Sequence, residues 1–487
     1  MTTATATQPR PAGRPGPASP APAGTQGWGP LLVVLAGTFM ALLDFFIVNV
    51  ALPSIQSGLH ASRAAVQLII AGYGLTFATG MISGGRLGDL YGRRRMFMTG
   101  LALFTLTSAA CGLAPGAGLL IGARVLQGAA GALMTPQVLA IIGIVYAGSR
   151  RDRAFAAYGL AMGFAGVLGQ LLGGAIITAS VGGSGWRGIF LINVPVGLTA
   201  LVLARRVIPE SAGHGVRSST GPSNAGRLDL AGTALATAGL AAVVAPLIEG
   251  QQYGWPAWTW ASLAAAPVLL GGFVVHQRRR AASGRSPLVD PGLFASRGFS
   301  VGSLAALAFG LVPASFFFVL ALFLQDGLGL SPLLSGEVFA AVGAGYFAAM
   351  MLATGLARRL GRQVLALGAA VVAAGALLLA AADGGTSWAP LLPGLAVTGF
   401  GIGLVLVPLS ATVLAGVDPQ HAGAAAGVLA TAQQVGGAVG VALVGVVFYR
   451  SLGAGAFGHA MTVALILLAG LTVATAALVQ LLPRRAR

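Results

Sequence analysis

The feature that most constrains this chain is a series of about fourteen apolar runs, each about 20 residues long, divided by short stretches rich in Arg, Gly and Pro. A helix of that length matches the hydrocarbon thickness of a bilayer. Of the 487 residues, 56% are hydrophobic and 8% are charged, so a soluble fold would lack the polar side chains to cover its surface. We therefore predict an all-α integral membrane protein. The expected spans are 29–53, 65–84, 96–114, 118–146, 154–180, 188–207, 229–249, 257–276, 299–324, 333–356, 363–382, 389–415, 424–449 and 460–482.

The distribution of arginine predicts the orientation of these spans. The chain has no lysine, and its arginines gather in alternate loops, which is typical of cytoplasmic loops. Only Arg63, Arg187 and Arg450 fall in the loops expected outside. We therefore expect both termini in the cytoplasm and a multi-pass protein in the plasma membrane. Arginine without lysine, with abundant Ala and Gly, suggests a bacterium with a GC-rich genome, such as an actinobacterium.

The formal charge of +17 does not indicate a nucleic-acid partner, because most of the positive charge lies beside apolar helices. Anionic lipid headgroups are the expected partner of such loops. Residues 1–27 are rich in Pro, Ala and Thr, and we expect a disordered cytoplasmic tail there. Cys111 is the only cysteine, so no disulfide can form within one chain.

A short glycine- and arginine-rich hairpin follows the second apolar run. It reads Gly85-Arg86-Leu87-Gly88-Asp89-Leu90-Tyr91-Gly92-Arg93-Arg94-Arg95. This segment resembles the loop between helices 2 and 3 of the major facilitator superfamily. The resemblance implies a conformational latch formed by Gly85, Gly88, Asp89, Gly92 and Arg93, in which Asp89 meets the start of a later helix near Ala422–Gly427. The alternative is that the arginines only enforce topology.

Weaker repeats point to two related halves. The segment Gly355–Arg362 echoes the hairpin, and the separation of Gly159 from Gly169 recurs between Gly427 and Gly437. Both echoes join helix n to helix n+8, as two six-helix halves with two extra helices between them would give. The expected divisions are the tail at 1–27, a first half at 28–208, a loop at 209–228, two inserted helices at 229–276, a loop at 277–298 and a second half at 299–487.

Three further stretches resemble the fourteen-helix drug:proton antiporters of this superfamily, the EmrB/QacA type. They are Leu43–Pro53 in the first span, Arg124–Gly128 in the fourth, and Trp186–Gly197 before the sixth. The resemblance implies alternating access driven by the proton gradient, with no cofactor and no metal. The antiporter signature G-P-x-x-G-G is matched at Gly169, Gly173 and Gly174, with Gln170 in place of the proline. These glycines are candidates for gating, and ordinary helix packing is the alternative.

Asp44 is the single acidic residue that falls deep inside a predicted span, roughly 14 Å from its Pro53 end at about 1.5 Å per residue. A charge there is costly, so it marks a functional site by default. Arg124 lies at a similar depth in the fourth span. We hypothesise that Asp44 takes up a proton from outside and then releases Arg124. The alternative is a permanent structural ion pair.

Polar, aromatic and methionine residues that are expected to face the bundle interior are candidates for lining a substrate cavity. They are Phe45, Asn49, Gln127, Met134, Gln325, Gln433 and Gln434. Such a cavity suits small hydrophobic or amphipathic compounds, and packing is the alternative role for each residue.

We therefore predict a monomeric exporter of drugs or antibiotics, coupled to protons, and not an enzyme. The nearest alternative is a facilitator-fold importer or symporter of a polar metabolite. A receptor or scaffold without transport activity is a third possibility, but the longest loops leave room for no folded soluble domain.

Overall fold

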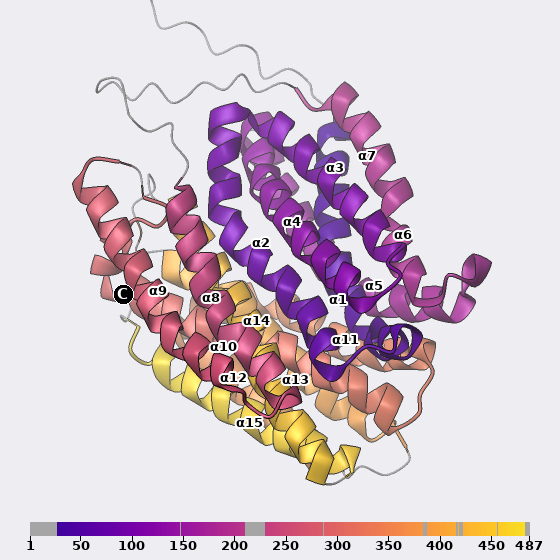
Figure 1. The fold of residues 1–487 in the computed structure, drawn as a ribbon. Coiled ribbons are helices and arrows are strands. Elements are labelled where there is room, and N and C mark those ends of the chain that lie inside the picture. Colours follow the sequence, from indigo (N-terminus) through magenta and orange to yellow (C-terminus); the bar gives the residue numbers. More distant parts are fainter. Residues whose placement is uncertain are drawn as a thin grey trace, which may run out of the picture.

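The computed structural model describes residues 27–146, 148–209, 229–285, 287–382, 387–414, 417, 422–454 and 456–482. Every regular element in this part is a helix (Figure 1). The long helices are α1 (Gly29–Leu59), α2 (Arg63–Tyr91), α3 (Arg93–Gly112), α4 (Ala117–Val145), α5 (Gly148–Ala179), α7 (Asn193–Val207), α8 (Leu230–Gln252), α9 (Ala257–Ala282), α10 (Arg297–Leu322), α11 (Pro332–Leu360), α12 (Gln363–Ala381), α13 (Leu391–Leu414), α14 (Ala422–Ala454) and α15 (Phe457–Val479). The short ones are η1 (Val181–Gly183), η2 (Gly185–Arg187), α6 (Gly188–Leu191), η3 (Pro291–Ala295) and η4 (Phe323–Gly327).

The predicted all-helical membrane class is confirmed. Within the described residues, 12 helices are long and apolar enough to cross a bilayer, or up to 13 if the two parts of α5, bent by 41°, form one span. Helix α3 is not among them, because it begins with three arginines and carries several Thr and Ser residues. The expected number of fourteen spans therefore stays a prediction.

Local sequence signals fix several helix ends. Ser62 and Ser331 each accept a hydrogen bond from the backbone N–H three residues later, which satisfies a free donor in the first turn of α2 and α11. Proline follows Ser331 directly, at a position where its missing N–H costs nothing. Helix α1 ends at His60, which adopts the left-handed conformation.

The helices form two groups, with α8 and α9 beside them. In the first group α4 packs against α2 and α3, and α1 packs against α5. In the second group α13 packs against α11 and α12, and α10 packs against α14. Helices α8 and α9 pack on each other and reach the groups mainly through α2 and α14, on the outside of the bundle (Figure 1). This arrangement agrees with two halves and an inserted pair, while the domain boundaries themselves stay a prediction.

The two groups meet along α5 and α11, along α2 and α14, and where α1 approaches α10. We name the end of the bundle where α2 joins α3 at Gly92 the hairpin end, and the other the opposite end. Residues 1–26, 210–228 and 483–487, which include the predicted tail and most of the long loop, lie outside the described part.

Candidate functional site

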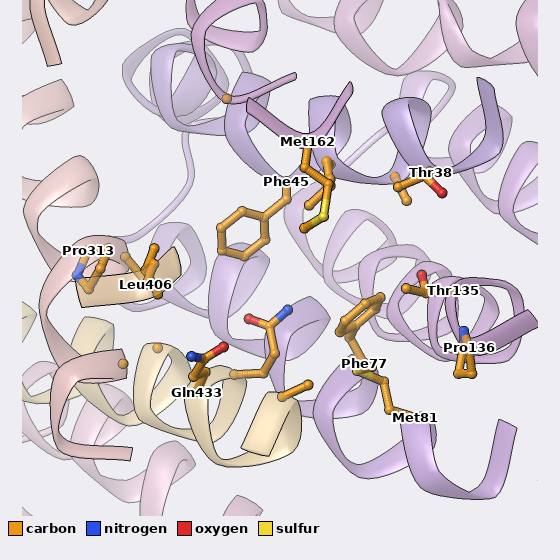
Figure 2. A pocket seen from close by; sticks show the side chains of 18 of the residues that line it. Thr38, Phe45, Phe77, Met81, Thr135, Pro136, Met162, Pro313, Leu406 and Gln433 are labelled. Atoms are coloured by element: carbon orange, nitrogen blue, oxygen red, sulfur yellow. The ribbon is translucent and has the colours of Figure 1, made fainter. Parts of the chain in front are cut away.

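A cavity of about 1030 Å³ lies between the two groups. Its volume suits a drug-sized molecule. Figure 2 shows part of its wall, in which apolar and aromatic side chains from both groups face one another. The lining residues include Thr38, Phe45, Phe46, Tyr73, Phe77, Met81, Thr135, Pro136 and Met162 from the first group, and Pro313, Phe317, Phe339, Val342, Leu406, Gln433 and Gln434 from the second.

The cavity extends to the hairpin end, because Gly85, Arg86 and Arg93 of the hairpin line it. Leu288 and Asp290, between α9 and α10, line it as well.

At the opposite end the two groups are in contact. The side-chain amide of Gln325 donates to the carbonyl of Val50 over 2.7 Å, and the guanidinium of Arg63 lies 5.0 Å from the ring centre of Tyr449. Helices α5 and α11 approach so closely that a Cβ at Gly174 would lie 2.4 Å from the carbonyl oxygen of Pro332. Within the described residues, the cavity therefore reaches the hairpin end, while the two groups close it at the opposite end.

Asp44 of α1 and Arg124 of α4 form a buried ion pair next to this cavity. Nη1 of Arg124 lies 2.5 Å from Oδ2 of Asp44, and neither side chain is exposed by more than 1%. Oδ1 of Asp44 accepts hydrogen bonds from Gln127 and Asn193, each over 3.0 Å. The carboxylate thus has three donors, which is the condition under which a buried charge is tolerated.

Arg124 is held from three further directions. Its Nε donates to the carbonyl of Ile69 on α2 over 3.2 Å, and its Nη1 donates to Oε1 of Gln127 over 2.7 Å. The guanidinium carbon lies 4.2 Å from the ring centre of Tyr73, a cation–π contact. Tyr73 also lines the cavity, whereas Asp44 and Arg124 do not. The aromatic ring therefore stands between the ion pair and the cavity.

The predicted cavity residues divide into two sets. Phe45, Gln433 and Gln434 line the cavity, and Figure 2 places Phe45 and Gln433 in its wall. The other four do not line it: Asn49, Gln127, Met134 and Gln325. Their polar groups are used elsewhere: Asn49 donates to two carbonyls of its own helix, Gln127 belongs to the ion-pair network and Gln325 links the two groups. Met134 is fully buried against Gly37.

The hairpin is fastened to α4 through Gln137. Nε2 of Gln137 donates to the carbonyl of Gly84 over 2.7 Å, and Nη1 of Arg93 donates to Oε1 of Gln137 over 3.1 Å. A Cβ at Gly88 would lie 1.9 Å from that same oxygen, so a larger residue there would displace the side chain of Gln137. Gly92 has a φ of 97°, which also favours glycine. The side chains of Asp89 and of residues 421–424 lie outside the described part, so the predicted latch contact stays a prediction.

The glycines singled out in α5 lie at close helix contacts. A Cβ at Gly169 would approach Phe46, and one at Gly173 would lie 2.8 Å from Ile47, both on α1. Gly174 faces α11, as noted above. Gly169 and Gly173 thus let α5 approach α1 within the first group, and Gly174 lets it approach the second group.

Sequence reasoning gave no role to Asn193, Tyr73 or Gln137. Asn193 lies within a quoted stretch, Trp186–Gly197, and its polar side chain among apolar neighbours was the available signal. Tyr73 and Gln137 also stand in apolar runs, without a spacing that marks them. Among the described residues, no group of three or more His, Cys, Asp or Glu side chains could hold a metal ion.

Comparison with known proteins identifies the family. The sequence model of the Major Facilitator Superfamily matches residues 34–231 and 227–441. The chain is 38% identical to a probable actinorhodin transporter of Streptomyces coelicolor, over 91% of this chain and 76% of that protein. It is 37% identical to a puromycin resistance protein of Streptomyces alboniger, over 86% and 81% of the two chains.

Two further comparisons extend this result. A tetracenomycin C resistance and export protein of Streptomyces glaucescens is 32% identical, over 88% of this chain and 77% of that protein. A solved structure of a bacterial homologue of the human lysosomal transporter Spinster, in an inward-facing and unoccupied conformation, superposes with a TM-score of 0.62. That match has 18% identity and covers 94% of this chain and 96% of the other, and it supports the fold alone.

Proposed function

The chain belongs to the Major Facilitator Superfamily, and on that premise we propose that it exports small amphipathic or hydrophobic compounds, such as drugs or antibiotics, in exchange for protons. The termini lie in the cytoplasm, the hairpin end faces the cytoplasm, and the protein works as a monomer in the plasma membrane of a bacterium. The large apolar cavity, reached from the hairpin end, supports a substrate of this kind. Relatives named for the transport or export of antibiotics, or for resistance to them, agree with it.

The observation that carries the proton exchange is the buried pair of Asp44 and Arg124 behind Tyr73. Three donors stabilise the carboxylate form of Asp44 in the state whose cavity reaches the hairpin end. Protonation removes the charge that attracts Arg124, and an unpaired guanidinium at this depth is costly. Arg124 is then left with the neutral partners Ile69, Gln127 and Tyr73, and we expect it to move, so that each charge state of Asp44 has its own conformation.

Helix α1 links the protonation of Asp44 to the cavity and to the second group of helices. The residues after Asp44 are Phe45 and Phe46, which line the cavity, and six positions after Asp44 the carbonyl of Val50 accepts the bond from Gln325 of η4. A shift of α1 on protonation therefore acts on the contacts that close the opposite end. Binding of a proton there favours the state open to the outside, and loss of the proton favours the state described above.

The proposal is tested in inside-out membrane vesicles with an acidic lumen and a panel of cationic, neutral and anionic dyes. We expect dye uptake to be accompanied by release of protons from the lumen. Asp44→Asn abolishes the coupled release, and Glu337→Gln, at an exposed carboxylate on α11, leaves it unchanged. Dye uptake that ignores the gradient, or full coupling in Asp44→Asn, refutes proton exchange through this residue.

A further inference from the structure

Six aromatic rings follow one another across the wall of the cavity. The centroid distances are 5.8 Å for Phe77 and Tyr73, 6.2 Å for Tyr73 and Phe45, 5.3 Å for Phe45 and Phe46, 5.6 Å for Phe46 and Phe317, and 5.9 Å for Phe317 and Phe339. All six side chains line the cavity, and the series passes from the first group to the second. Such a wall offers ring faces and edges to a flat aromatic molecule.

Gln170 of α5 also lines the cavity, at the place where α5 meets α11. The side chain is 2% exposed, and within the described part of the chain neither its amide oxygen nor its amide nitrogen has a hydrogen-bond partner. A buried amide without partners is costly, and native proteins rarely leave one. By contrast, the buried glutamines Gln127, Gln137 and Gln325 all donate or accept hydrogen bonds within the protein.

The position of Gln170 is fixed by its backbone. A Cβ at Gly336 of α11 would lie 2.6 Å from the carbonyl oxygen of Gln170, so the two helices hold the residue against the second group. The unpartnered amide is therefore anchored on the cavity wall. Both amide atoms are buried in this structure, so a rotation of the side chain brings them to a molecule in the cavity.

The charged side chains in the described cavity wall lie away from Gln170. They are Arg86, Arg93 and Asp290, and all three stand at the hairpin end. Asp290 accepts a hydrogen bond from the backbone N–H of Gly292, and Arg93 donates to Gly85 and Gln137. The part of the cavity beside Gln170 and the aromatic rings thus offers neutral polar groups only, and it has no counter-ion for a charged substrate.

We propose that Gln170 is a substrate-recognition residue, and that the deep cavity takes a flat, uncharged aromatic molecule that carries a hydroxyl or carbonyl group on its rings. An amide presents an acceptor oxygen and a donor nitrogen, so it can accept from a ring hydroxyl or donate to a ring carbonyl. The rings of Phe46 and Phe317 contact the aromatic part of the same molecule. This inference rests on the proposed export function and adds the substrate class and the residue that selects it.

The test uses two probes of the same three-ring shape: 2-hydroxyanthraquinone, whose hydroxyl lies too far from the ring carbonyls to bond to them, and anthracene. Equilibrium binding to the purified full-length protein in lipid nanodiscs is measured for the wild type and for Gln170→Met. We expect the variant to bind the quinone about fivefold to tenfold more weakly, because one or two hydrogen bonds are lost. Its affinity for anthracene stays unchanged.

The matched control is Gln67→Met, at a buried glutamine of α2 whose Oε1 also lacks a partner in the described structure but which does not line the cavity. It leaves both affinities unchanged. If Gln170→Met does not fold, Gln170→Asn is used in its place, because it keeps the amide group on a shorter side chain. We expect Gln170→Asn to weaken binding of the quinone and to leave binding of anthracene unchanged. An equal loss for both probes, or the same loss in Gln67→Met, overturns the proposal.

The two proposals fail differently. The wild-type protein could exchange other dyes for protons and yet bind neither ring probe. That result refutes the role of Gln170 and leaves the export function in place. A wild-type protein that binds the quinone through Gln170 but moves no dye in vesicles refutes export alone.

Discussion

Nη1 of Arg124 and Oδ2 of Asp44 lie 2.5 Å apart between two membrane-spanning helices, and both side chains are withdrawn from solvent. The contact joins α4 to α1. Since Arg124 also donates to the carbonyl of Ile69, α2 is tied to the same point. Three helices that border one cavity therefore depend on the ionisation of a single carboxyl group.

A double-mutant cycle on this pair separates its structural role from its role in transport. Asp44→Asn leaves a buried guanidinium without its counter-ion, and we expect a loss of about 3–5 kcal/mol in stability. Arg124→Gln, which leaves the carboxylate alone, loses a similar amount. The double variant recovers a large part of that stability, because neither charge remains, yet it stays inactive in proton-coupled export. Thermal unfolding of the purified proteins and dye export measure the two effects. Additive losses of stability, or export by the double variant, contradict this account.

Tyr73 is expected to keep the ion pair separate from the water that enters the cavity. Its ring lies 4.2 Å from the guanidinium carbon of Arg124, and its hydroxyl donates to the carbonyl of Ala41 over a long 3.5 Å. Tyr73→Phe keeps the ring and changes export little. Tyr73→Ala opens a path from the cavity to Asp44, and we expect a proton leak in the absence of substrate. Decay of a pH gradient in vesicles measures that leak, and equal decay in both variants refutes the barrier role.

Gly336 controls closure of the opposite end. A Cβ there would lie 2.6 Å from the backbone oxygen of Gln170, so Gly336→Ala forces α11 away from α5 and favours the state open at that end. A cysteine placed at Leu139, which lines the cavity, should then react more slowly with a reagent added from the hairpin end. Gly355→Ala on the same helix is the control, because nothing lies within 4 Å of a Cβ there. Equal labelling rates in the two glycine variants contradict the prediction.

Asp229 fastens the inserted helices at the hairpin end, just before the span of α8. Burial by itself raises the pKa of its carboxyl, but bonds from Gln277, His276 and the backbone of Gly232, together with the charge of Arg280, outweigh burial and hold the pKa below its ordinary value. A lowered carboxyl pKa contributes stability that is present above the unfolded pKa of about 3.9 and is lost as the pH falls through the folded pKa.

Asp229→Asn keeps the cap of α8 but removes this charge. We expect the variant to unfold at a lower temperature than the wild type near neutral pH, with a loss of the order of 1 kcal/mol. The difference begins to narrow below about pH 4, because the carboxyl of the unfolded wild type then takes up a proton, and it is lost as the pH falls through the lowered pKa of the folded state. Thermal unfolding of both proteins between neutral and acidic pH measures it. A difference that does not change with pH shows that the charge contributes nothing.

The residues of the candidate site differ in how well the sequence predicts their roles. Asp44 was identifiable because an acid at that depth in an apolar run is costly, and Arg124 because it is a cation at similar depth. Gln325 and Asn49 are also polar residues in or beside apolar runs, but they bond to backbone carbonyls outside the cavity wall. Gln170 was noticed only as a replacement for a proline. Nothing in its neighbours predicted an amide without partners on the cavity wall.

The sequence by itself determined the membrane class, the apolar runs and the identity of the two buried charges, Asp44 and Arg124. The reason is that polar groups are costly in hydrocarbon, so the few that occur there stand out in the sequence. Only the tertiary structure decided which faces of the helices line the cavity. Membrane helices are apolar toward lipid as well as toward their neighbours. Their hydrophobic pattern therefore does not predict which face of each helix points into the bundle. The orientation of the helices depends on close packing at glycines and on hydrogen bonds between residues distant in the sequence, such as that from Gln325 to Val50. These contacts form only when the two groups of helices pack together.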